Sequence, residues 1–434
     1  MKKYAILIVL SLTSVMGISQ TMNVYWGTNQ PSYPFHIWRD NIKQVDYKSY
    51  SLLIYLETLS GEEEPYMGFG HEDIQYVTFS SKEEAPIRFV PEEAYKSTDF
   101  SKDGQITVMQ RHQHGKGIPL VILGDAFSDR MIDLGLFDYY AQQAMNAFFA
   151  KEPFTTFKDY FDVYAVTAVS LKEVQSKETA FGYGMDNSIT ADGDKKLYNY
   201  VLSIPDLNGS VKDVTAIMIL NLSSDFNGSY HTNFYNENFN VGQTSFVMTN
   251  EYERFNNYLV WHEAGGHAFG LLDDERLDNG ASNIYPEDEH QLLDEAHNVG
   301  SRMNIDYHDT PETILWKDFI ANPDYEVEQI GLYEGALYSF GKGIYRPTET
   351  SIMFSSGVND YYNAPSRWAI YQRIMKLAGE ECKFENFLEY DKKNLEMIRS
   401  LNAARRRSSS AIPVGPICPG DNQTNCCKQT ILLK

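Results

Sequence analysis

Apolar residues follow two different spacings along the chain, and the change between them divides it into regions. Up to Gly117 the apolar runs are short, rich in β-branched and aromatic residues, and separated by Gly, Pro, Asp and Ser; residues 52–56, 75–79 and 105–109 are examples. Runs of this kind predict short strands joined by turns. We therefore expect residues 20–117 to form a small β-sandwich, in which no catalytic motif is visible.

A continuous apolar run at residues 118–123 begins the second region and is typical of a strand buried on both faces. Apolar positions near helical spacing follow at 133–150, then a strand at 163–170, a helix at 194–203 and a strand at 214–220. This alternation predicts an α/β layer with a partly parallel sheet. The expected fold class is thus α+β with several domains, in which the β-sandwich precedes an α/β domain.

Three further helices are predicted from signals at their ends. Asn250 is a good N-cap and has a Glu three residues later, which is the capping-box pattern. Thr310 is followed directly by Pro, another typical helix start. The last helix covers about residues 366–378, and Gly379 is expected to end it. The second domain should therefore extend over residues 118–380.

Residues 381–434 have the composition of a polar tail. The Arg and Ser run at 405–410 and the proline-containing stretch at 413–419 are typical of linkers. Cysteine occurs only in this segment, at Cys382, Cys418, Cys426 and Cys427. The last two are adjacent and lack the C-x-x-C spacing of a zinc site, which favours disulfides or free thiols.

The first 19 residues have the parts of a signal peptide. Two lysines precede an apolar run, and small residues occupy the positions expected before a cleavage after Ser19. This run is too short to span a bilayer comfortably, and no later segment is long and apolar enough. We therefore expect no membrane span, and an exported chain that is secreted or held at the cell surface or in the periplasm.

The charge balance excludes one class of partner. The chain has 37 Lys and Arg residues against 59 Asp and Glu residues, a net charge of −22. A chain this acidic repels the phosphates of nucleic acids. We therefore expect no nucleic-acid binding.

The strongest chemical signal lies at residues 261–275, which read WHEAGGHAFGLLDDE. Two imidazoles, His262 and His267, and a carboxylate that follows them are ligand types of a catalytic zinc site, which keeps one position for water. Glu263 is placed to take a proton from the zinc-activated water and to pass it to the leaving amine. The motif therefore predicts a zinc peptidase with one catalytic ion and a protein or peptide substrate.

The spacing of the two histidines departs from that of common zinc peptidases, in which they lie four residues apart. On an α-helix, residues five apart point about 140° away from each other, so His262 and His267 could not share one ion. An i→i+5 turn would return both rings to one face. Because Gly265 and Gly266 deform at low steric cost, we predict a widened turn at residues 264–266.

The third ligand is expected just beyond the helix. Gly270 can end the helix in the left-handed conformation and return the chain to the metal. Asp273 has the spacing of the metzincin motif, H-x-x-G-x-x-(H or D), and Asp274 comes one residue later, so the spacing leaves both open. Met353, in residues 351–357, fits a Met-turn, which would form an apolar floor below the metal.

These features resemble the IgA peptidase family, a group of secreted metzincin-like metallopeptidases found largely in bacteria. The resemblance covers roughly residues 118–378. Besides the zinc helix, the segments that carry it include IPLVILGDAFS at 118–128, YEGA at 333–336, GIYRP at 343–347 and APSR at 364–367. It implies a metzincin-like catalytic domain with an active-site helix, with His262 and His267 as zinc ligands, Glu263 as the catalytic residue and Met353 as the Met-turn.

The resemblance also distinguishes the two aspartates. Relatives tend to have a single Asp followed by Glu and an aromatic residue. Aligned in this way, Asp274 and Glu275 match and Asp273 does not, while Arg276 replaces the aromatic. This favours Asp274 as the third ligand, with Asp273 as the alternative. The implied activity is endopeptidase cleavage of extracellular proteins, with an edge strand from residues 214–249 binding the substrate.

Two other functions stay open at this point. The H-E-x-x-G-H pattern also resembles that of dipeptidyl peptidase III, an exopeptidase family whose third ligand is a Glu from a distant motif that we do not find here. The other is an inactive peptidase-like protein that binds or adheres through its β-domain. Tyr361 and Tyr362 are candidates for an oxyanion donor, but structural roles are favoured for both.

Overall fold

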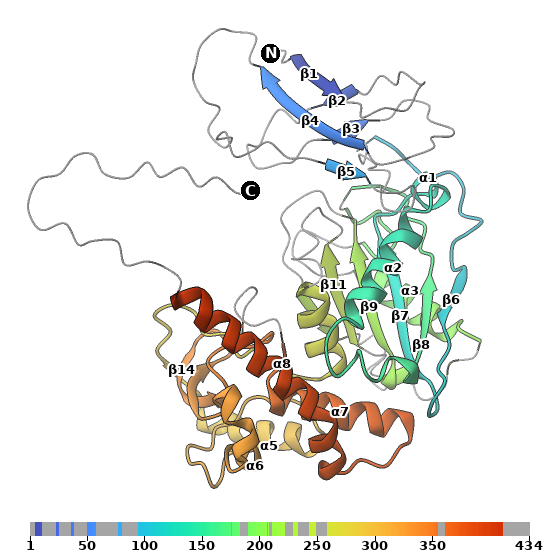
Figure 1. The fold of residues 1–434 in the computed structure, drawn as a ribbon. Coiled ribbons are helices and arrows are strands. Elements are labelled where there is room, and N and C mark those ends of the chain that lie inside the picture. The colour runs from blue at the N-terminus through green and yellow to red at the C-terminus, as the bar shows by residue number, and fades with distance from the viewer. Residues whose placement is uncertain are drawn as a thin grey trace, which may run out of the picture.

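The computed structural model describes residues 94–174, 176–182, 190–205, 207, 211–221, 258–354 and 361–403 in full, and only the backbone of residues 5–10, 23–25, 36–38, 50–57, 77–79, 229–232, 243–248 and 404–410. A mixed sheet with helices on both faces forms the first part of the described core (Figure 1). A second part, mostly helical, carries a small sheet.

The large sheet has six strands in the order β10-β11-β9-β7-β8-β6. The four inner strands run parallel, whereas β10 and β6 pair antiparallel at the two edges. The partly parallel sheet predicted from the alternating pattern is thus present. Its strands are β6 (Ile106–Gln110), β7 (Ile118–Asp125), β8 (Phe161–Val166), β9 (Thr215–Leu220), β10 (Ser229–Thr232) and β11 (Gln243–Met248).

Alternate residues of β7 enter two separate cores, which explains why its apolar run is continuous. Leu120 and Ile122 pack into the core that contains α2 (Leu136–Phe148). Val121 and Leu123, on the opposite face, pack with α3 (Ala191–Leu202). The helix that carries the histidine motif shares the α2 face, so the strands and α2 together support it.

The second part of the chain is built from short elements and two longer helices. A three-stranded sheet has the order β12-β14-β13. The elements, with the short helices of the first part, are α1 (Asp129–Asp133), η1 (Lys158–Tyr160), η2 (Val211–Asp213), β12 (Asn283–Ile284), η4 (Glu287–Glu289), α5 (His290–Asn298), α6 (Lys317–Ile320), η5 (Pro323–Glu328), β13 (Tyr333–Ala336), β14 (Phe340–Arg346), α7 (Ala364–Ala378) and α8 (Phe384–Ser410).

The predicted final helix is confirmed, and its ends have the expected chemistry. In α7 the Asn363 side chain accepts a hydrogen bond from the Ser366 amide, and Gly379 follows the helix with a φ of 72°. The helix start predicted at Thr310 is wrong. Residues 310–316 form bends and turns, and the helix α6 begins only at Lys317. The amide of Leu315 donates to the Asp306 carboxylate at 2.7 Å instead of to a helix carbonyl. The Asn250 start lies outside the described residues.

The segment after Gly379 is not simply a polar tail, because α8 follows it. Phe387, Leu395 and Ile398 are buried, and the first two belong to the same core as α2. This helix was not predicted because it has few apolar residues among many charged ones. The linker predicted at residues 405–410 is also wrong, since α8 extends through it.

The domain boundary predicted at residue 117 lies earlier in the chain. Strand β6 belongs to the large sheet, paired with β8. The segment after it is held in place: His112 Nδ1 lies 2.9 Å from the Asp162 carboxylate, and the Lys116 amide donates to the Ala378 carbonyl. The main body therefore begins before residue 106.

The amino-terminal strands form two small sheets, β1-β4-β5 and β2-β3. They comprise β1 (Ala5–Leu10), β2 (Asn23–Tyr25), β3 (His36–Trp38), β4 (Tyr50–Glu57) and β5 (Val77–Phe79). Strand β1 falls within the predicted signal peptide. The sandwich and the signal peptide both stay predictions.

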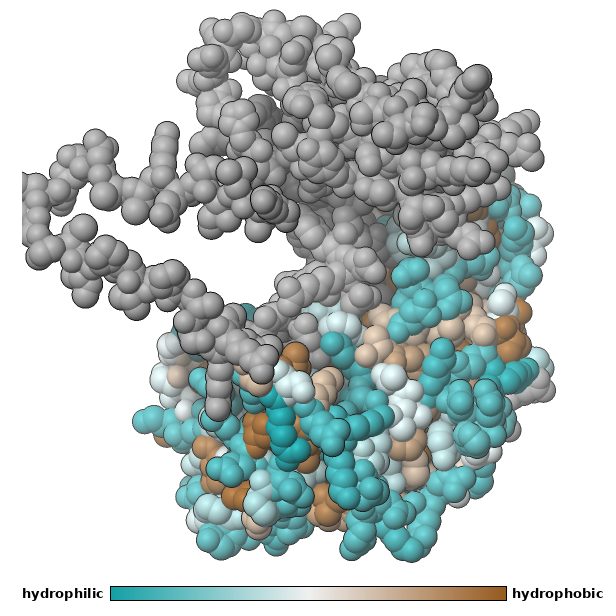
Figure 2. Space-filling model, viewed as in Figure 1, coloured by the Kyte–Doolittle hydropathy of each residue, from teal (hydrophilic) through white to brown (hydrophobic). Residues whose placement is uncertain are grey.

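The visible surface of the described core is mostly hydrophilic, interrupted by small apolar areas (Figure 2). Within the described part of the chain, no helix combines the length and the apolar character needed to cross a bilayer. Of the cysteines, Cys382 is exposed and unpaired, and the other three lie outside the described residues.

Candidate metal centre

The helix that carries the two histidines is a π-helix, η3 (Val260–Phe269), as the glycine pair predicts. At its end the Gly270 amide donates to the carbonyl of Gly265, five residues earlier, at 2.9 Å. The wider turn brings the rings of His262 and His267 to the same face, with centroids 4.7 Å apart. One extra residue per turn therefore converts an i, i+5 spacing into a shared site.

Contacts from other parts of the chain explain why two glycines occupy this turn. A methyl group at Gly265 would overlap the Tyr362 hydroxyl and the Phe154 ring. A methyl group at Gly266 would overlap the thioether of Met353. The glycines thus serve close packing around the distorted helix as well as backbone freedom.

The end of the helix differs from its prediction. Gly270 is right-handed, with φ of −72°, and Leu271 has the left-handed conformation instead, with φ of 54°. Gly270 is needed for space, because a side chain there would overlap the carbonyl oxygen of Gly266 and the side chain of Ile370. The chain nevertheless turns back toward the histidines, as expected.

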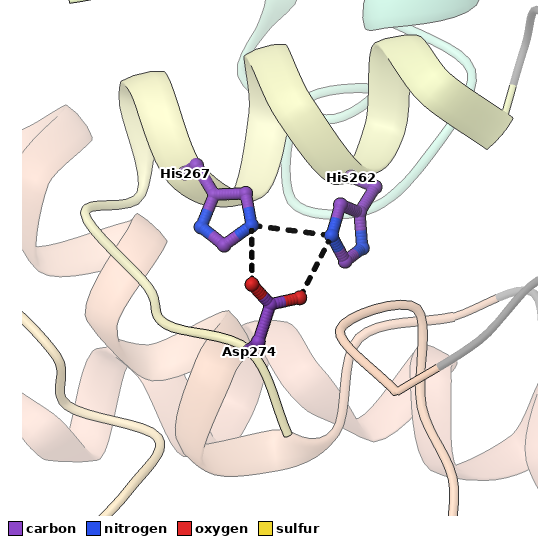
Figure 3. A group of neighbouring side chains, drawn as sticks. All are labelled: His262, His267 and Asp274. Atoms are coloured by element: carbon purple, nitrogen blue, oxygen red, sulfur yellow. Dashed lines mark hydrogen bonds and ion pairs between the residues drawn. The ribbon is translucent and has the colours of Figure 1, made fainter. Parts of the chain in front are cut away.

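His262, His267 and Asp274 converge on one point (Figure 3). The two Nε2 atoms are 3.1 Å apart. His262 Nε2 lies 3.2 Å from Asp274 Oδ1, and His267 Nε2 lies 3.5 Å from Asp274 Oδ2. Both histidines are buried, and the Asp274 side chain is 16% exposed. Among the described residues, this is the one group of three side chains arranged to hold a metal ion.

Hydrogen bonds on the far side of each ring fix which atoms face inward. His262 Nδ1 lies 2.9 Å from the carbonyl of Ile352, and His267 Nδ1 lies 2.8 Å from the carbonyl of Leu272. Since a carbonyl can only accept, each Nδ1 donates its proton outward, and each Nε2 is the atom that can offer a lone pair to an ion at the centre. Two lone pairs and a carboxylate therefore meet, an arrangement that requires a cation.

The distances fit a zinc ion. Tetrahedral zinc with bonds of about 2.0–2.1 Å separates its ligand atoms by about 3.3 Å. The three observed separations lie between 3.1 and 3.5 Å. The carbonyls of Ile352 and Leu272 supply the outer hydrogen bonds that normally orient metal-binding imidazoles.

Asp274, and not Asp273, faces the histidines. The Asp273 backbone is held by Asn304, whose side chain accepts from the Asp273 amide at 2.9 Å and donates to its carbonyl at 2.8 Å. Its carboxylate lies 3.3 Å from Arg302 Nε, and it accepts from the amide of Asp274. The chain thus directs the first acid outward and the second toward the rings.

Glu263 shares this buried environment. Burial raises the pKa of its carboxyl, the two histidines lower it, and Asp274 raises it further, for a net increase. For His267 without a metal, burial lowers the pKa, but the hydrogen bond and the charge of Asp274 outweigh it and raise the value to about 9. The site therefore favours a positive charge between its acceptors, whether a proton or a metal ion supplies it.

Met353 lies where a Met-turn residue is expected, fully buried against Gly266 between the two histidines. The same turn supports His262 through the Ile352 carbonyl, and Ser351 Oγ accepts from the Met353 amide at 3.0 Å. The turn is tied to the third-ligand segment, because the Glu275 amide donates to the Met353 carbonyl at 2.9 Å.

Glu275 is a part of the centre that the motif alone does not reveal. It is fully buried, and its carboxylate accepts from Ser351 Oγ at 2.6 Å, from Asn304 at 3.0 Å and from Asn363 at 2.9 Å. These partners come from the Met-turn, from the loop after α5 and from the start of α7. The residue after Asp274 therefore joins three elements around the candidate site.

The nearby tyrosines have different roles. Tyr258 donates to the Ile352 carbonyl at 3.0 Å, and its hydroxyl lies 3.2 Å from His262 Nδ1. Its place one turn before His262 is the signal that could have found it. Tyr362 is fully buried and donates to the Trp261 carbonyl, which supports the structural role expected for it. Tyr361 contributes its carbonyl, which accepts from the Ile352 amide.

No protein-family model matches this chain, and no curated protein matches it either.

Proposed function

We propose that the protein is a secreted zinc-dependent endopeptidase that hydrolyses peptide bonds of extracellular proteins, with a metzincin-like catalytic domain similar to that of the IgA peptidase family. One observation carries the proposal: two imidazole nitrogens and one carboxylate converge at 3.1–3.5 Å beside the buried Glu263. His262, His267 and Asp274 would hold the ion, and a predicted signal peptide supports export.

When bound, zinc supplies a Lewis acid that acidifies water and polarises a peptide carbonyl. The chain's own residues divide the remaining work. Glu263 accepts the proton of the attacking water and delivers it to the nitrogen of the leaving amine as the C–N bond breaks. Its raised pKa, caused mainly by burial, suits it to carry that proton. Met353 and the Ile352 carbonyl keep the histidine side of the site fixed.

The large sheet offers a place for an extended substrate. Strand β10 is the edge strand, and both β10 and β11 lie beside η3. The outer side of an edge strand has unpaired amides and carbonyls, so an extended peptide can add to it by backbone hydrogen bonds. Such a peptide would pass next to the helix that holds the histidines.

The geometry favours this function over the two alternatives. A dipeptidyl peptidase III-like site would take a Glu from a distant motif as third ligand, whereas the acid beside the histidines is Asp274, seven residues after His267. An inactive binding protein has no need of a buried Glu beside three converging ligands. Neither alternative is supported by a specific observation.

Glu263→Gln tests the chemistry. The variant should keep its zinc, because the ligands are unchanged, but lose about 10²–10⁴-fold in the rate of peptide-bond cleavage, because the amide cannot accept the proton. Cleavage of an unfolded protein substrate by the zinc-loaded full chain, followed by mass spectrometry, measures the rate and shows whether internal bonds are cut. Full activity of the variant would contradict the proposal.

A matched pair of neighbouring aspartates tests the ligands. Asp274→Asn should lose most of its zinc affinity, whereas Asp273→Asn should bind zinc nearly as the natural chain does, because Asp273 faces Arg302. Competition with a chromophoric chelator measures both affinities. Equal losses in the two variants would mean that Asp274 is not the ligand.

A further inference from the structure

Tyr338 lies in a strained turn next to the third ligand. Leu337 and Tyr338 are in the link between β13 and β14, and both have left-handed backbone angles, with φ of 56° and 62°. For a residue with a side chain this conformation costs about 1 kcal/mol or more. Two such residues in succession must be held there by the surrounding structure.

The turn is fastened to the segment that begins with Asp274. The Leu337 amide donates to the Asp274 carbonyl at 3.1 Å, and the Tyr338 amide donates to the Arg276 carbonyl at 2.7 Å. The Tyr338 carbonyl in turn accepts from the Asp278 amide at 2.8 Å. The position of Tyr338 is thus fixed relative to the third ligand, and the strain serves that position.

The side chain reaches from this turn to the metal centre while it stays open to solvent. Tyr338 is 40% exposed. The Tyr338 hydroxyl faces the Asp274 carboxylate as a hydrogen-bond partner, and Glu263 lies near enough for its charge to act on the phenol. The Arg276 guanidinium lies over the ring, 5.4 Å from its centroid, and restrains it.

Two other described tyrosines beside the histidine helix are not available in this way. The hydroxyl of Tyr258 donates to the Ile352 carbonyl, and that of Tyr362 donates to the Trp261 carbonyl in a fully buried position. The Tyr338 hydroxyl instead faces the carboxylate of Asp274, which would also bind the metal. A substrate oxygen arriving there can take over its hydrogen bond.

We propose that Tyr338 is a catalytic residue, whose phenol donates a hydrogen bond to the carbonyl oxygen of the scissile peptide as that oxygen gains negative charge. This inference rests on the proposed peptidase function. The phenol neither gives up nor gains a proton. Water adds to the carbonyl carbon, the C–N bond breaks, and Glu263 carries the proton to the amine, while Tyr338 stabilises the charge in between.

Tyr338→Phe in the zinc-loaded full chain tests the inference, because it keeps the ring and the turn. We expect kcat to fall about 10²–10³-fold with little change in KM, as when one oxyanion donor is removed. The affinity for a phosphinic peptide, which imitates the charged tetrahedral state, should fall by a similar factor in calorimetry. Zinc affinity, measured with a chelator, should not change.

Tyr333→Phe is the matched control. Tyr333 lies in β13 of the same small sheet, and its hydroxyl donates to the Gln329 carbonyl at 2.9 Å. This variant should match the natural chain in kcat, phosphinic-peptide affinity and zinc affinity. A loss common to both variants would mean that the hairpin, and not the Tyr338 hydroxyl, is what matters.

The possible failures are distinguishable. If the natural chain is active and Tyr338→Phe is equally active, this inference is overturned and the proposed function stands. If kcat and zinc affinity fall together, Tyr338 only positions Asp274, and the catalytic role is overturned. If the natural chain neither cleaves peptides nor binds the phosphinic peptide, and Glu263→Gln changes nothing, both proposals fail.

Discussion

Among the described residues, the buried cluster around Arg367 and the cluster of His262, His267 and Asp274 differ in where the positive charge comes from. In the first, Arg367 meets Glu328 and Asp391, each at 2.6 Å, and all three side chains are buried. In the second, His262 and His267 direct lone pairs at each other and at Asp274. The first contains its own cation, whereas the second has only acceptors and needs a cation from outside.

The arginine cluster satisfies every oxygen from within the chain. Besides Arg367, Asp391 accepts from Tyr325 at 3.0 Å and from Asn394 at 2.6 Å, and Glu328 accepts from the Ala364 amide at 3.0 Å. This cluster joins η5, α7 and α8. A buried charge set of this kind is costly to break because the remaining charges cannot reach water. The arginine cluster is therefore structural, whereas the histidine cluster is the candidate metal site.

The largest expected effect comes from removing the internal cation. Arg367→Met leaves two carboxylates buried without a partner and should lower the free energy of unfolding by about 3–5 kcal/mol. Added zinc should not restore this loss, since the acids of this cluster lie apart from the histidines. Urea unfolding with and without zinc measures both effects. The exposed Arg399→Met, on α8, the helix that carries Asp391, is the control and should change little.

Removing the external cation should have the next largest effect. A ligand that binds only the folded chain stabilises it by about 2.7 kcal/mol at 100 times its Kd and by about 4.1 kcal/mol at 1,000 times. Chelation should therefore lower stability by a similar amount in the natural chain. In His267→Asn, chelation should change stability little. A chelator effect of equal size in both would show that the ion binds elsewhere.

The two clusters also differ in how well they could be predicted from the sequence. Strands β7, β8 and β9 were predictable because their residues are buried on both faces, and the glycine pair between the histidines predicted the π-helix. Both signals are local. The arginine cluster was not predicted, because its members come from three elements and α8 has few apolar residues to mark it.

The choice between the two aspartates could not be made from spacing for a similar reason. Asn304, 31 residues away, holds the Asp273 backbone through two hydrogen bonds and so decides which side chain turns inward. The left-handed residue after the helix is Leu271, not Gly270, and Gly270 is needed instead for close packing against Ile370. Contacts between distant segments decided these details, and local patterns do not encode them.

A smaller effect is expected from pH on the metal-free protein. Burial lowers the pKa of His267, but Asp274 raises it to about 9, above the ordinary value of 6.5. Because the folded value is raised, its stabilising contribution is complete below pH 6.5 and is lost as the pH rises through about 9. Urea midpoints of chelated protein should fall over this window. Asp274→Asn should lose this pH dependence of stability. If the variant keeps it, a proton on His267 does not stabilise the metal-free site through Asp274.

Zinc binding should show the opposite trend over the same window. Zinc affinity should rise with pH, because the imidazoles must lose their protons before they bind the ion. Arg367 keeps its charge throughout, since its two carboxylates outweigh the effect of burial and raise its pKa further. Chelator competition at several pH values measures the trend, and an affinity that falls with pH would contradict it.

The smallest expected effect concerns Glu275, a buried carboxylate that belongs to neither cluster. Its oxygens accept from hydroxyl and amide donors of Ser351, Asn304 and Asn363. Glu275→Gln places an amide group against one of these donors, which should cost about 1–3 kcal/mol. Because Glu275 adjoins Asp274 and bonds to the Met-turn, zinc affinity should also fall about 10–100-fold. Chelator competition and urea unfolding measure the two effects.

Asp278→Asn provides the comparison for Glu275. Asp278 lies on the same segment, exposed and paired with Arg276 at 3.4 Å, so its substitution should leave zinc affinity and stability nearly unchanged. If Glu275→Gln lowers stability but leaves zinc affinity intact, Glu275 belongs with the arginine cluster as a purely structural charge. If stability and zinc affinity both fall, zinc binding depends on Glu275, although this carboxylate does not contact the ion. The hydrogen bonds that Glu275 accepts would then help to hold the three metal-binding side chains in place.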